Sequence, residues 1–476
     1  MKKNAPKKHA DKDSSPIKLA EPITVDRRSR ADRKDEGKAL RLAAPLASHA
    51  QWHAPTHRRD PIDLLIESGA GRVPELLPIR YGRMMQSPFT FYRGAAAIMA
   101  ADLAGLPSTG IRVQACGDCH LLNFGSFATP ERRQVFAIND FDETLPAPWE
   151  WDVKRLAASF VVAARSNSYS ADEAREAAQT CARSYRERMR EFSKMGVLDV
   201  WYLSIDLEAA IEEIDDEIAK ERGKKRMAKA RDRDVMDEDF PEMVTFEGGV
   251  HRIRDNPPLI FHTQGEEEAV LEARVREAFE AYRATLPEDR RLLLDRYEYK
   301  DLAMKVVGVG SVGTRCAIML MMGGADDVLF LQVKEARASV LEPYAGQSTY
   351  TNHGQRVVMG QRLMLSASDI FLGWTESNIG KHFYIRQLRD MKLKPLVELY
   401  TPAVMNQYAE LCGWALAQAH ARSGDAAKIA GYLGKKEDFD IAITDFSERY
   451  ADQNELDYKA LVQAVQQGRL EVYLER

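Results

Sequence analysis

The apolar positions of the chain repeat with two periods, one typical of helices and one typical of strands. Residues 60–69, "DPIDLLIESG", place apolar side chains at helical spacing after Asp60, which suits a helix N-cap. Residues 89–107, "FTFYRGAAAIMAADLAGLP", predict a second helix that ends near Gly105. Residues 151–166, "WDVKRLAASFVVAARS", predict a long helix with a broad apolar face.

Short apolar runs bounded by turn residues predict strands in two separate regions. The earlier region holds 111–118, "IRVQACGD", and 134–143, "QVFAINDFDE". The segment 205–290 is expected to be helical and heavily charged. The later strands are expected within 302–324, "LAMKVVGVGSVGTRCAIMLMMGG", 327–336, "DVLFLQVKEA", and 381–388, "KHFYIRQL".

The order of these elements predicts an α+β fold with two lobes. A chain of 476 residues exceeds the size that one hydrophobic core usually serves. We expect residues 1–45 to form a disordered basic tail and 46–290 to form most of a mainly helical larger lobe, with a charged helical insertion. We expect 291–395 to form a smaller β-rich lobe, and 396–476 to add the helices that complete the larger lobe.

Composition narrows the class of protein. With 45% hydrophobic residues, 29% charged residues and a net charge of -5, the chain gives no case for binding nucleic acid. The basic excess is local, because residues 1–41 hold 13 Lys or Arg and 7 Asp or Glu, or 13 - 7 = +6. That stretch lacks the apolar core of a signal peptide, and no run approaches the roughly 18 apolar residues of a membrane span. We therefore expect a cytoplasmic protein with no membrane partner.

The segment "GVGSVG" carries Gly308, Gly310 and Gly313 in a G-x-G-x-x-G pattern, which fits two kinds of phosphate site. In a dinucleotide-binding unit such glycines open a helix, whereas in a kinase-type site they turn between two strands. A "GGADD" turn follows after about ten residues, which favours a hairpin over a crossover helix. Lys334 then lies on the next strand, where a lysine can reach nucleotide phosphates. A tight turn and an ordinary surface lysine remain the alternative.

The segment "CGDCHLLNFG", residues 116–125, admits four interpretations. Its cysteines have the spacing of a redox pair, of covalent haem attachment or of half a zinc site. Haem attachment needs export, zinc needs a second ligand pair, and a redox pair needs a helix N-terminus, none of which the neighbourhood indicates. We favour the fourth interpretation, in which Asp118, His120 and Asn123 handle a phosphate and a metal and the cysteines only line the loop.

Phosphoryl transfer needs a carboxylate for the hydroxyl proton, oxygen ligands for magnesium and a lysine on the phosphates. Asp118 and Asn123 are five residues apart, the separation of base and metal-binding amide in a kinase catalytic loop, and the acidic run "NDFDE" follows one strand later. We assign Asp118 and His120 as catalytic residues, with His120 holding the loop. Asn123 and Asp140 are the expected magnesium ligands, and Lys334 with the three glycines is the expected ATP-binding group.

Longer motifs carry a resemblance to known families. "GDCHLLNFG" and "NDFDETLPAPWEWDVKRLAAS" resemble the catalytic half of aminoglycoside phosphotransferases and related kinase-like small-molecule kinases. A wider set, including "SPFTFYRG", "KVVGVGSVGTR", "LQVKEA" and "YIRQLRDMK", resembles the uncharacterised bacterial family called domain of unknown function 2252, from about residue 55 to the end. The first resemblance implies a two-lobed kinase-like fold, ATP and magnesium as cofactors, and a small-molecule substrate. The second implies no particular activity.

The motif order differs from that of kinases, because the catalytic loop precedes the glycine-rich loop by almost 200 residues. We interpret this order as a circular permutation of the kinase-like fold. A separation above about 15 Å between Lys334 and Asp140, the room that one nucleotide needs, would refute it. By strand alternation Glu335 points away from Lys334, so the partner of that lysine is left open among Glu342 and the two glutamines of "GQRVVMGQR", residues 354–362.

Several supporting roles stay open from the sequence. Asp152 either braces the catalytic loop from behind or caps its own helix. Arg80, Arg83 and Arg93 either bind an anionic substrate or lie on the surface. The main hypothesis is an ATP- and magnesium-dependent phosphotransferase acting on a hydroxyl. The alternatives are a nucleotide-binding pseudokinase and a dinucleotide-dependent oxidoreductase, which requires a helix directly after Gly313.

Overall fold

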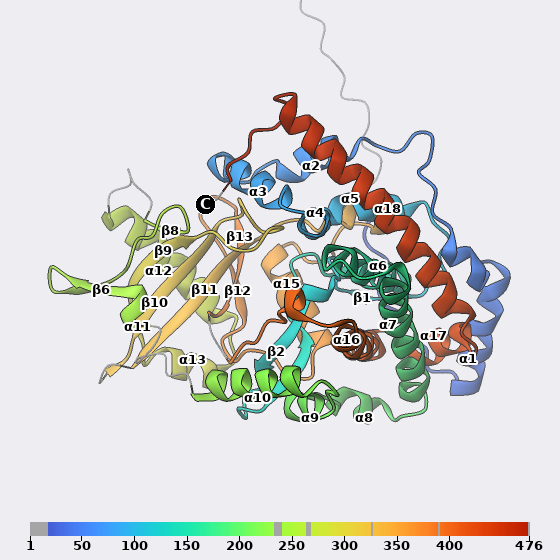
Figure 1. Cartoon of the computed structure of the whole chain (residues 1–476). Helices are drawn as coiled ribbons and strands as arrows, with labels where there is room; N and C mark the ends of the chain where they lie inside the picture. The colour runs from blue at the N-terminus through green and yellow to red at the C-terminus, as the bar shows by residue number, and fades with distance from the viewer. Residues whose placement is uncertain (1–17, 233–239, 263–267, 325–326, 389–390, 475–476) are drawn as a thin grey trace, which may run out of the picture.

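The protein has a mixed α+β structure in which a sheet-rich side lies next to a helix-rich side (Figure 1). The computed structural model describes residues 18–232, 240–262, 268–324, 327–388 and 391–474. The sheet-rich side is built on one antiparallel sheet with the strand order β12-β13-β11-β10-β9-β8. Its strands are β8 (Ile260–Phe261), β9 (Glu298–Lys305), β10 (Cys316–Met322), β11 (Val328–Ala336), β12 (Gly373–Glu376) and β13 (His382–Gln387).

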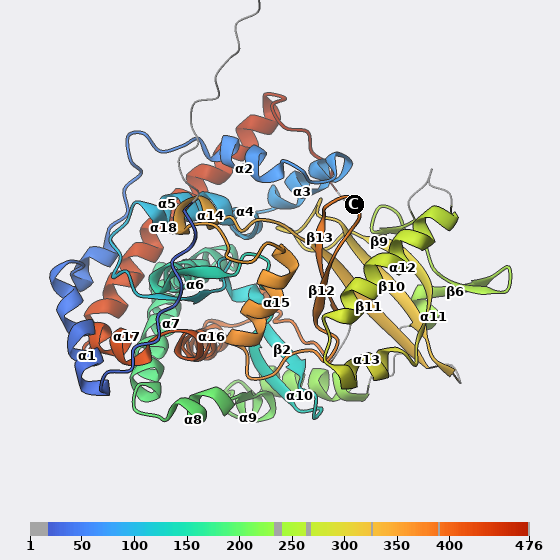
Figure 2. The same cartoon turned by 180° about the vertical axis from the view of Figure 1, so that it is seen from behind.

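Alternation along β10 gives this sheet two apolar faces. Ile318 and Leu320 pack with the hairpin of β6 (Val244–Glu247) and β7 (Val250–Ile253). Met319 and Met321 pack with α12 (Glu268–Ala284) and α13 (Glu288–Leu294), and Figure 2 shows α12 lying across the sheet. Because both faces are covered, β10 is buried along its whole length.

From the charge of residues 205–290 we expected a helical segment. The structure contradicts this expectation in part, because the segment also contains strands. It contains the β6–β7 hairpin and β8 besides α10 (Glu217–Asp232), α11 (Phe240–Met243) and α12. The missed signal is "VTFEGGVHRI", two short runs around Gly248 and Gly249, which both have positive φ and form the turn. The later part of this segment, from Met243 to Leu286, packs on the sheet, whereas Ile211 and Met227 pack with the helices.

Four long helices form the core of the helix-rich side. They are α6 (Trp149–Ser166), α7 (Ala171–Phe192), α16 (Pro402–Ser423) and α18 (Asp438–Gln466), and α7 packs against the other three. Trp149 at the start of α6 stacks on Tyr185 of α7 with ring centroids 5.6 Å apart. The long helix predicted for 151–166 is confirmed, and it is buried on nearly all sides. The prediction of one apolar face therefore underestimated how much of the helix is buried.

Two small sheets lie beside these helices. One pairs β1 (Arg112–Ala115) with β4 (Leu145–Pro148), and the other joins β2 (Phe124–Ala128), β3 (Gln134–Ile138) and β5 (Ile205–Asp206). The helix α15 (His353–Met364) packs on β11 and β13 of the large sheet and also on β1 and α16. It thus connects the two sides of the molecule. The other short helices are α2 (Pro61–Gly69), α3 (Leu77–Met84), α4 (Pro88–Gly94), α5 (Ala96–Ala104), α8 (Val197–Tyr202), α9 (Leu207–Glu212) and α14 (Glu342–Ala345).

The helix predicted for 60–69 is confirmed as α2, with Asp60 as its N-cap. The single helix predicted for 89–107 is divided into α4 and α5. The division falls at Ala95, which leaves the helical region with φ -105° and ψ 23°. It allows α4 to follow a capping box at Ser87 while α5 packs its own apolar residues inside.

The expected disordered tail is wrong for residues 18–45. Residues Arg30–Ala39 form α1, which packs on α17 (Ala426–Leu433). The backbones approach so closely that a Cβ atom at Gly37 would lie 2.0 Å from the carbonyl oxygen of Lys428, and one at Gly431 would lie 2.1 Å from that of Lys34. Lys428 also binds Glu36 at 3.0 Å, so charges that suggested a solvated tail are partly paired. Residues 1–17 of the predicted tail lie outside the described residues.

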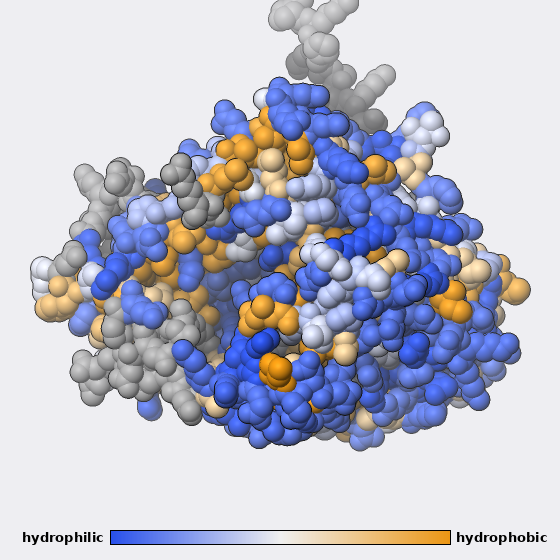
Figure 3. All heavy atoms as spheres, in the orientation of Figure 1, coloured by the Kyte–Doolittle hydropathy of each residue, from blue (hydrophilic) through white to orange (hydrophobic). Residues whose placement is uncertain are grey.

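Hydrophilic residues cover most of the face drawn in Figure 3, and hydrophobic residues appear there in separate patches. In the part of the chain that the structure describes, no helix combines the length and the apolar character needed to cross a bilayer. The apolar residues are instead gathered in clusters between the packed elements.

Candidate active site

Asp118 lies in the loop that leaves β1, and α6 holds this loop from behind. The carboxylate of Asp152 accepts hydrogen bonds from the backbone N–H groups of Cys116 at 2.6 Å and Gly117 at 3.0 Å. It also lies 3.2 Å from Nε2 of His420, and its side chain is only 1% exposed. Since a different residue caps α6, Asp152 acts as a brace for the loop and not as an N-cap.

One oxygen of Asp118 is fixed and the other is not. Nε and Nη2 of Arg155 donate to Oδ1 of Asp118 at 2.8 and 2.5 Å. Within the described residues no hydrogen bond reaches Oδ2. Burial raises the pKa of Asp118, and the positive charge of Arg155 opposes that rise. The carboxylate is thus oriented by α6 while retaining an oxygen that can accept a proton or a hydrogen bond.

Asn123 and His120 close the loop in different ways. Nδ2 of Asn123 donates to the backbone carbonyl of Asp118 at 2.7 Å, and the backbone N–H of Asn123 donates to the carbonyl of His120 at 2.8 Å. Nε2 of His120 lies 3.9 Å from Oδ2 of Asp118, which is too far for a hydrogen bond. Burial lowers the pKa of His120 well below its ordinary value, so the imidazole is neutral. The expected contribution of His120 to the loop comes from its backbone.

Lys334 of β11 is paired with an acidic residue that follows β3. Its Nζ donates to Oδ2 of Asp142 at 2.8 Å. The hydroxyl of Ser311 donates to the same oxygen at 3.1 Å, and the hydroxyl of Tyr384 donates to Oδ1 of Asp142 at 2.7 Å. Lys334 is only 3% exposed, so this is a buried ion pair with all of its oxygens satisfied.

The partner of Lys334 is thus none of Glu342, Gln355 and Gln361, among which the sequence left the choice open. Glu335 does point away from the lysine, as strand alternation predicts. It accepts a hydrogen bond from the backbone N–H of Arg315 at 2.9 Å.

The pKa values of Asp140 and Asp142 are shifted in opposite directions. Burial and the neighbouring charge of Asp142 raise the pKa of Asp140. Burial also acts on Asp142, but the charge and hydrogen bond of Lys334 lower the pKa of Asp142 below its ordinary value. The backbone N–H of Asp142 donates to Oδ1 of Asp140 at 3.2 Å, and in the described residues Asp140 has no ion pair of its own. Asp140 is therefore the carboxylate that a cation would stabilise.

The expected proximity of Lys334 and Asp140 is met. Lys334 contacts Asp142, and two residues of chain span no more than about 7 Å. The separation is thus well below the limit of about 15 Å set for the permuted arrangement.

The glycine-rich segment is a turn between strands. Gly308 and Gly313 have φ of 68° and 86°, and the segment joins β9 to β10, which pair in antiparallel fashion. A dinucleotide-binding unit needs a helix after Gly313, whereas β10 is a strand. A Cβ atom at Gly310 would lie 3.3 Å from the carbonyl oxygen of Arg93 and 3.9 Å from Oδ2 of Asp118, so the turn lies against the Asp118 loop.

A cavity of about 400 Å³ opens among these groups. Lys334 and Gly313 are not part of its lining, although Asp142, the partner of Lys334, is. The other six site residues predicted from the sequence line it: Asp118, His120, Asn123, Asp140, Gly308 and Gly310.

The arginines of the early helices have distinct positions. Arg80 is 2% exposed and donates to Ser68 and to the carbonyl of Gly94. Arg83 donates to the carbonyl of Gly308 at 2.5 Å and so steadies the glycine turn. Only Arg93, among the three that the sequence singled out, lines the cavity without a hydrogen bond to any described residue.

Sequence reasoning missed several residues of the site, above all Asp142, Arg155, Tyr384 and His420. Asp142 was visible as the second acid of "NDFDE", but nothing local favours it over Asp140 as a partner for a lysine 192 residues away. Arg155 lies three residues after Asp152 on α6, where a buried cation beside an apolar stripe was a usable signal. Tyr384 contacts Asp142 and His420 contacts Asp152, and both contacts join residues far apart in the sequence.

The sulfur-based interpretations of "CGDCHLLNFG" find no support in the geometry. A hydrogen bond from Cys119 would lower the pKa of Cys116, but burial and nearby acids raise it to about 11, and burial raises the pKa of Cys119 further. Both thiols are fully buried and therefore unsuited to redox exchange. Among the described residues no three His, Cys, Asp or Glu side chains form a metal-binding group.

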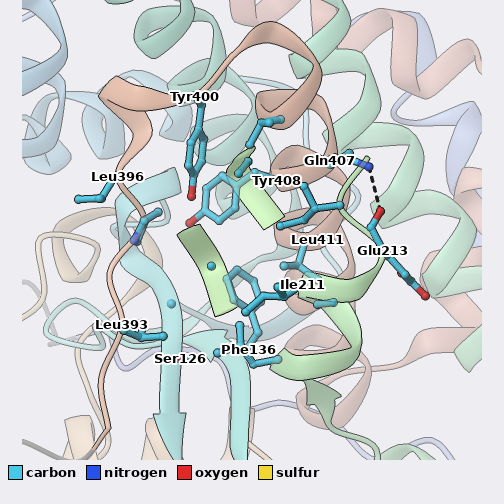
Figure 4. Close-up of a pocket in the computed structure, with 18 of the residues that line it drawn as sticks. Ser126, Phe136, Ile211, Glu213, Leu393, Leu396, Tyr400, Gln407, Tyr408 and Leu411 are labelled. Atoms are coloured by element: carbon cyan, nitrogen blue, oxygen red, sulfur yellow. Dashed lines mark hydrogen bonds between the residues drawn. The ribbon is translucent and has the colours of Figure 1, made fainter. Parts of the chain in front are cut away.

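A second cavity, of about 230 Å³, lies beside the first and is mainly apolar (Figure 4). Phe136, Tyr400 and Tyr408 form its aromatic walls. Lys394 and Pro395 line both cavities, so one short segment separates them.

The fold and the site define a mixed α+β protein with a buried lysine–carboxylate centre between a sheet and a helical core. The chain belongs to the family of uncharacterized proteins conserved in bacteria, DUF2252, whose model matches residues 72–464. No curated protein matches the chain, and no solved structure matches it.

Proposed function

We propose that the protein is an ATP- and magnesium-dependent phosphotransferase that acts on a hydroxyl of a small molecule. The observation that carries this proposal is the buried ion pair between Lys334 and Asp142. It joins the strand after a glycine-rich hairpin to the acidic turn that follows the catalytic loop, although these segments lie far apart in the sequence. This is the set of parts that phosphoryl transfer requires, around one cavity.

The proposal includes a circularly permuted, two-lobed, kinase-like fold. The six-stranded sheet is the smaller, nucleotide-binding lobe, and the helices around α6 and α16 form the larger lobe. The glycine turn between β9 and β10, Lys334 on β11 and the later strand β13 follow one another in the order of a kinase smaller lobe. The catalytic loop comes from the earlier part of the chain and is braced by His420 near the end of α16, through Asp152. This contact supports the proposed circular permutation, because it brings a helix from the C-terminal part of the chain to a loop from the N-terminal part.

In the proposed reaction the acceptor hydroxyl lies at Oδ2 of Asp118. Its oxygen attacks the γ-phosphorus of ATP, the bond from that phosphorus to the β-phosphate oxygen breaks, and ADP leaves. The hydroxyl proton passes to Asp118, whose Oδ1 is held by Arg155. Lys334 neutralises the nucleotide phosphates, and Gly308 and Gly310 let the backbone of the turn approach them.

The residues present fit magnesium. Asp140 is a partly buried carboxylate whose pKa is raised by burial and by the neighbouring charge of Asp142, and the amide of Asn123 has its nitrogen engaged, which leaves its oxygen for a cation. Magnesium takes oxygen ligands and is commonly held by one or two protein groups with phosphate oxygens and waters completing its shell. When bound, it would offset the charge that develops on the phosphates.

The test is turnover with magnesium and γ-labelled ATP, alone and with a small-molecule extract. We expect Asp118→Asn to lower the rate by about 10² to 10⁴, and Asp140→Asn to lower turnover and raise the magnesium concentration that turnover requires. Asp172→Asn, an exposed residue in the first turn of α7, is the matched control and should leave turnover unchanged.

A nucleotide-binding pseudokinase is the outcome if ADP with magnesium raises the melting temperature while no condition gives turnover. If the protein shows no thermal shift with ADP and magnesium and no turnover, both the phosphotransferase and the pseudokinase are refuted.

A further inference from the structure

Two cations of the catalytic cavity have no partner. Arg93 on α4 and Lys394, between β13 and α16, both line it. Within the described part of the chain neither side chain forms a hydrogen bond or an ion pair, and Nε of Arg93 is buried with no acceptor. Arg93 is partly buried, whereas Lys394 lies exposed at the edge of the cavity. For Arg93, a partly buried cation without a counter-charge is costly to keep in a folded protein.

The other cations in or beside this cavity are already engaged. Lys334 is bound by Asp142, and Arg386 contacts Gln332 and the carbonyl of Asn139. Arg72, Arg80 and Arg337 donate to backbone carbonyls around α2 and the glycine turn. Arg93 and Lys394 are thus the two lining cations left for a ligand.

The two cations are near each other and near the proposed reaction centre. Burial and then the charge of Arg93 lower the pKa of Lys394, while Asp140 acts in the opposite direction. Burial lowers the pKa of Arg93, and the charge of Asp118 opposes this. The carbonyl of Arg93 also lies against Gly310. An anion between Arg93 and Lys394 would relieve their repulsion and lie beside Asp118 and Asp140.

This position differs from that of the nucleotide phosphates in the proposed reaction. Lys334 and the glycine turn, which would hold those phosphates, come from the six-stranded sheet. Arg93 and Lys394 come from elements outside that sheet, on the side of the catalytic loop. Leu393 and Leu396, which flank Lys394 in the chain, border the apolar cavity in Figure 4.

We propose that the acceptor is itself an anion: a small hydroxyl compound with a compact oxyanion group, phosphate or carboxylate, that Arg93 and Lys394 bind. This inference rests on the proposed phosphotransferase function. The oxyanion forms charge-assisted hydrogen bonds to both cations and presents its hydroxyl to Oδ2 of Asp118. The transferred phosphoryl group then forms its new bond at that hydroxyl, and the oxyanion group remains unchanged.

The test uses the full chain saturated with ADP and magnesium, and inorganic phosphate or acetate as the probe in calorimetric titrations. We expect the wild type to bind one of these anions on top of ADP. Arg93→Gln and Lys394→Gln should each weaken that binding about tenfold or more, while Arg93→Lys retains most of it. Because the Arg93 side chain forms no hydrogen bond or ion pair with any described residue and its unpaired charge is costly, Arg93→Gln should melt at or above the wild-type temperature. Arg290→Gln, at a partly exposed arginine of α13 outside the cavity lining, is the control.

Three results would overturn the inference in distinguishable ways. Equal anion binding by the wild type and both Gln variants places the anion elsewhere. An anion that displaces ADP assigns the two cations to the nucleotide phosphates, while the proposed function stands. Loss of anion binding in the variants, together with a wild type that does not bind ADP, refutes both the phosphotransferase and the acceptor role of the anion site.

Discussion

Replacing Asp152 with alanine removes the brace behind the loop that carries Asp118. In the wild type this carboxylate accepts hydrogen bonds from the N–H groups of Cys116 and Gly117 at 2.6 and 3.0 Å and lies 3.2 Å from Nε2 of His420. A methyl group accepts none of them. Because the site is 1% exposed, water cannot readily replace the lost acceptor, and two backbone N–H groups stay buried and unpaired.

The expected loss follows from these contacts. A hydrogen bond to a charged group is worth about 1.5–3 kcal/mol, so two of them amount to about 3–6 kcal/mol. Removing Asp152 also removes the cost of burying a charge, which offsets part of this sum. We therefore expect the free energy of unfolding to fall by about 3 kcal/mol. Asp152→Asn should lose a similar amount, because its NH₂ group would face an N–H donor.

Urea unfolding followed by far-ultraviolet circular dichroism measures the loss, with Asp172→Ala as a surface control. Hydrogen exchange read by mass spectrometry on a peptide spanning residues 112–123 reports the loop directly. Its amides should exchange faster in Asp152→Ala, while peptides from α18 should change little. A loss below about 1 kcal/mol, or unchanged exchange in the loop peptide, would refute the reasoning that Asp152 holds the loop.

Three further outcomes are expected. Lys334→Met should weaken binding of ADP with magnesium by about tenfold or more in a titration, and an unaltered affinity would contradict its assignment to the phosphates. Burial lowers the pKa of His49 to about 3 from an ordinary 6.5, so stability present above pH 6.5 is lost as the pH falls towards 3. Between pH 7 and 5 this amounts to about 2 kcal/mol, and urea unfolding of His49→Gln should show a correspondingly shallower loss. Gly37→Ala should lower the melting temperature because its Cβ would meet the carbonyl of Lys428, whereas Gly105→Ala, with one atom at 4.0 Å, should not.

Local patterns were enough to predict many elements, and most of the site residues predicted from them line the cavity. The alternation and glycine turns around Gly308 correctly indicated a hairpin, and the spacing of Asp118 and Asn123 correctly indicated residues of one loop. These predictions succeed because strand, turn and helix signals depend on neighbouring residues. The same reasoning failed for α1, where charge suggested a solvated tail. There the deciding contact, Gly37 against Lys428, comes from the far end of the chain.

The sequence by itself determined the chemistry that is available: the acidic turn of Asp140, the glycine turn, and a lysine on the strand that follows it. Only the tertiary structure decided which groups meet. It paired Lys334 with Asp142 across 192 residues, set Arg155 on Asp118, and left Arg93 without a hydrogen-bond partner among the residues that the structure describes. The physical reason is that ion pairs, burial and pKa shifts depend on distance in space, which packing of the sheet against the helices fixes and which no local pattern encodes.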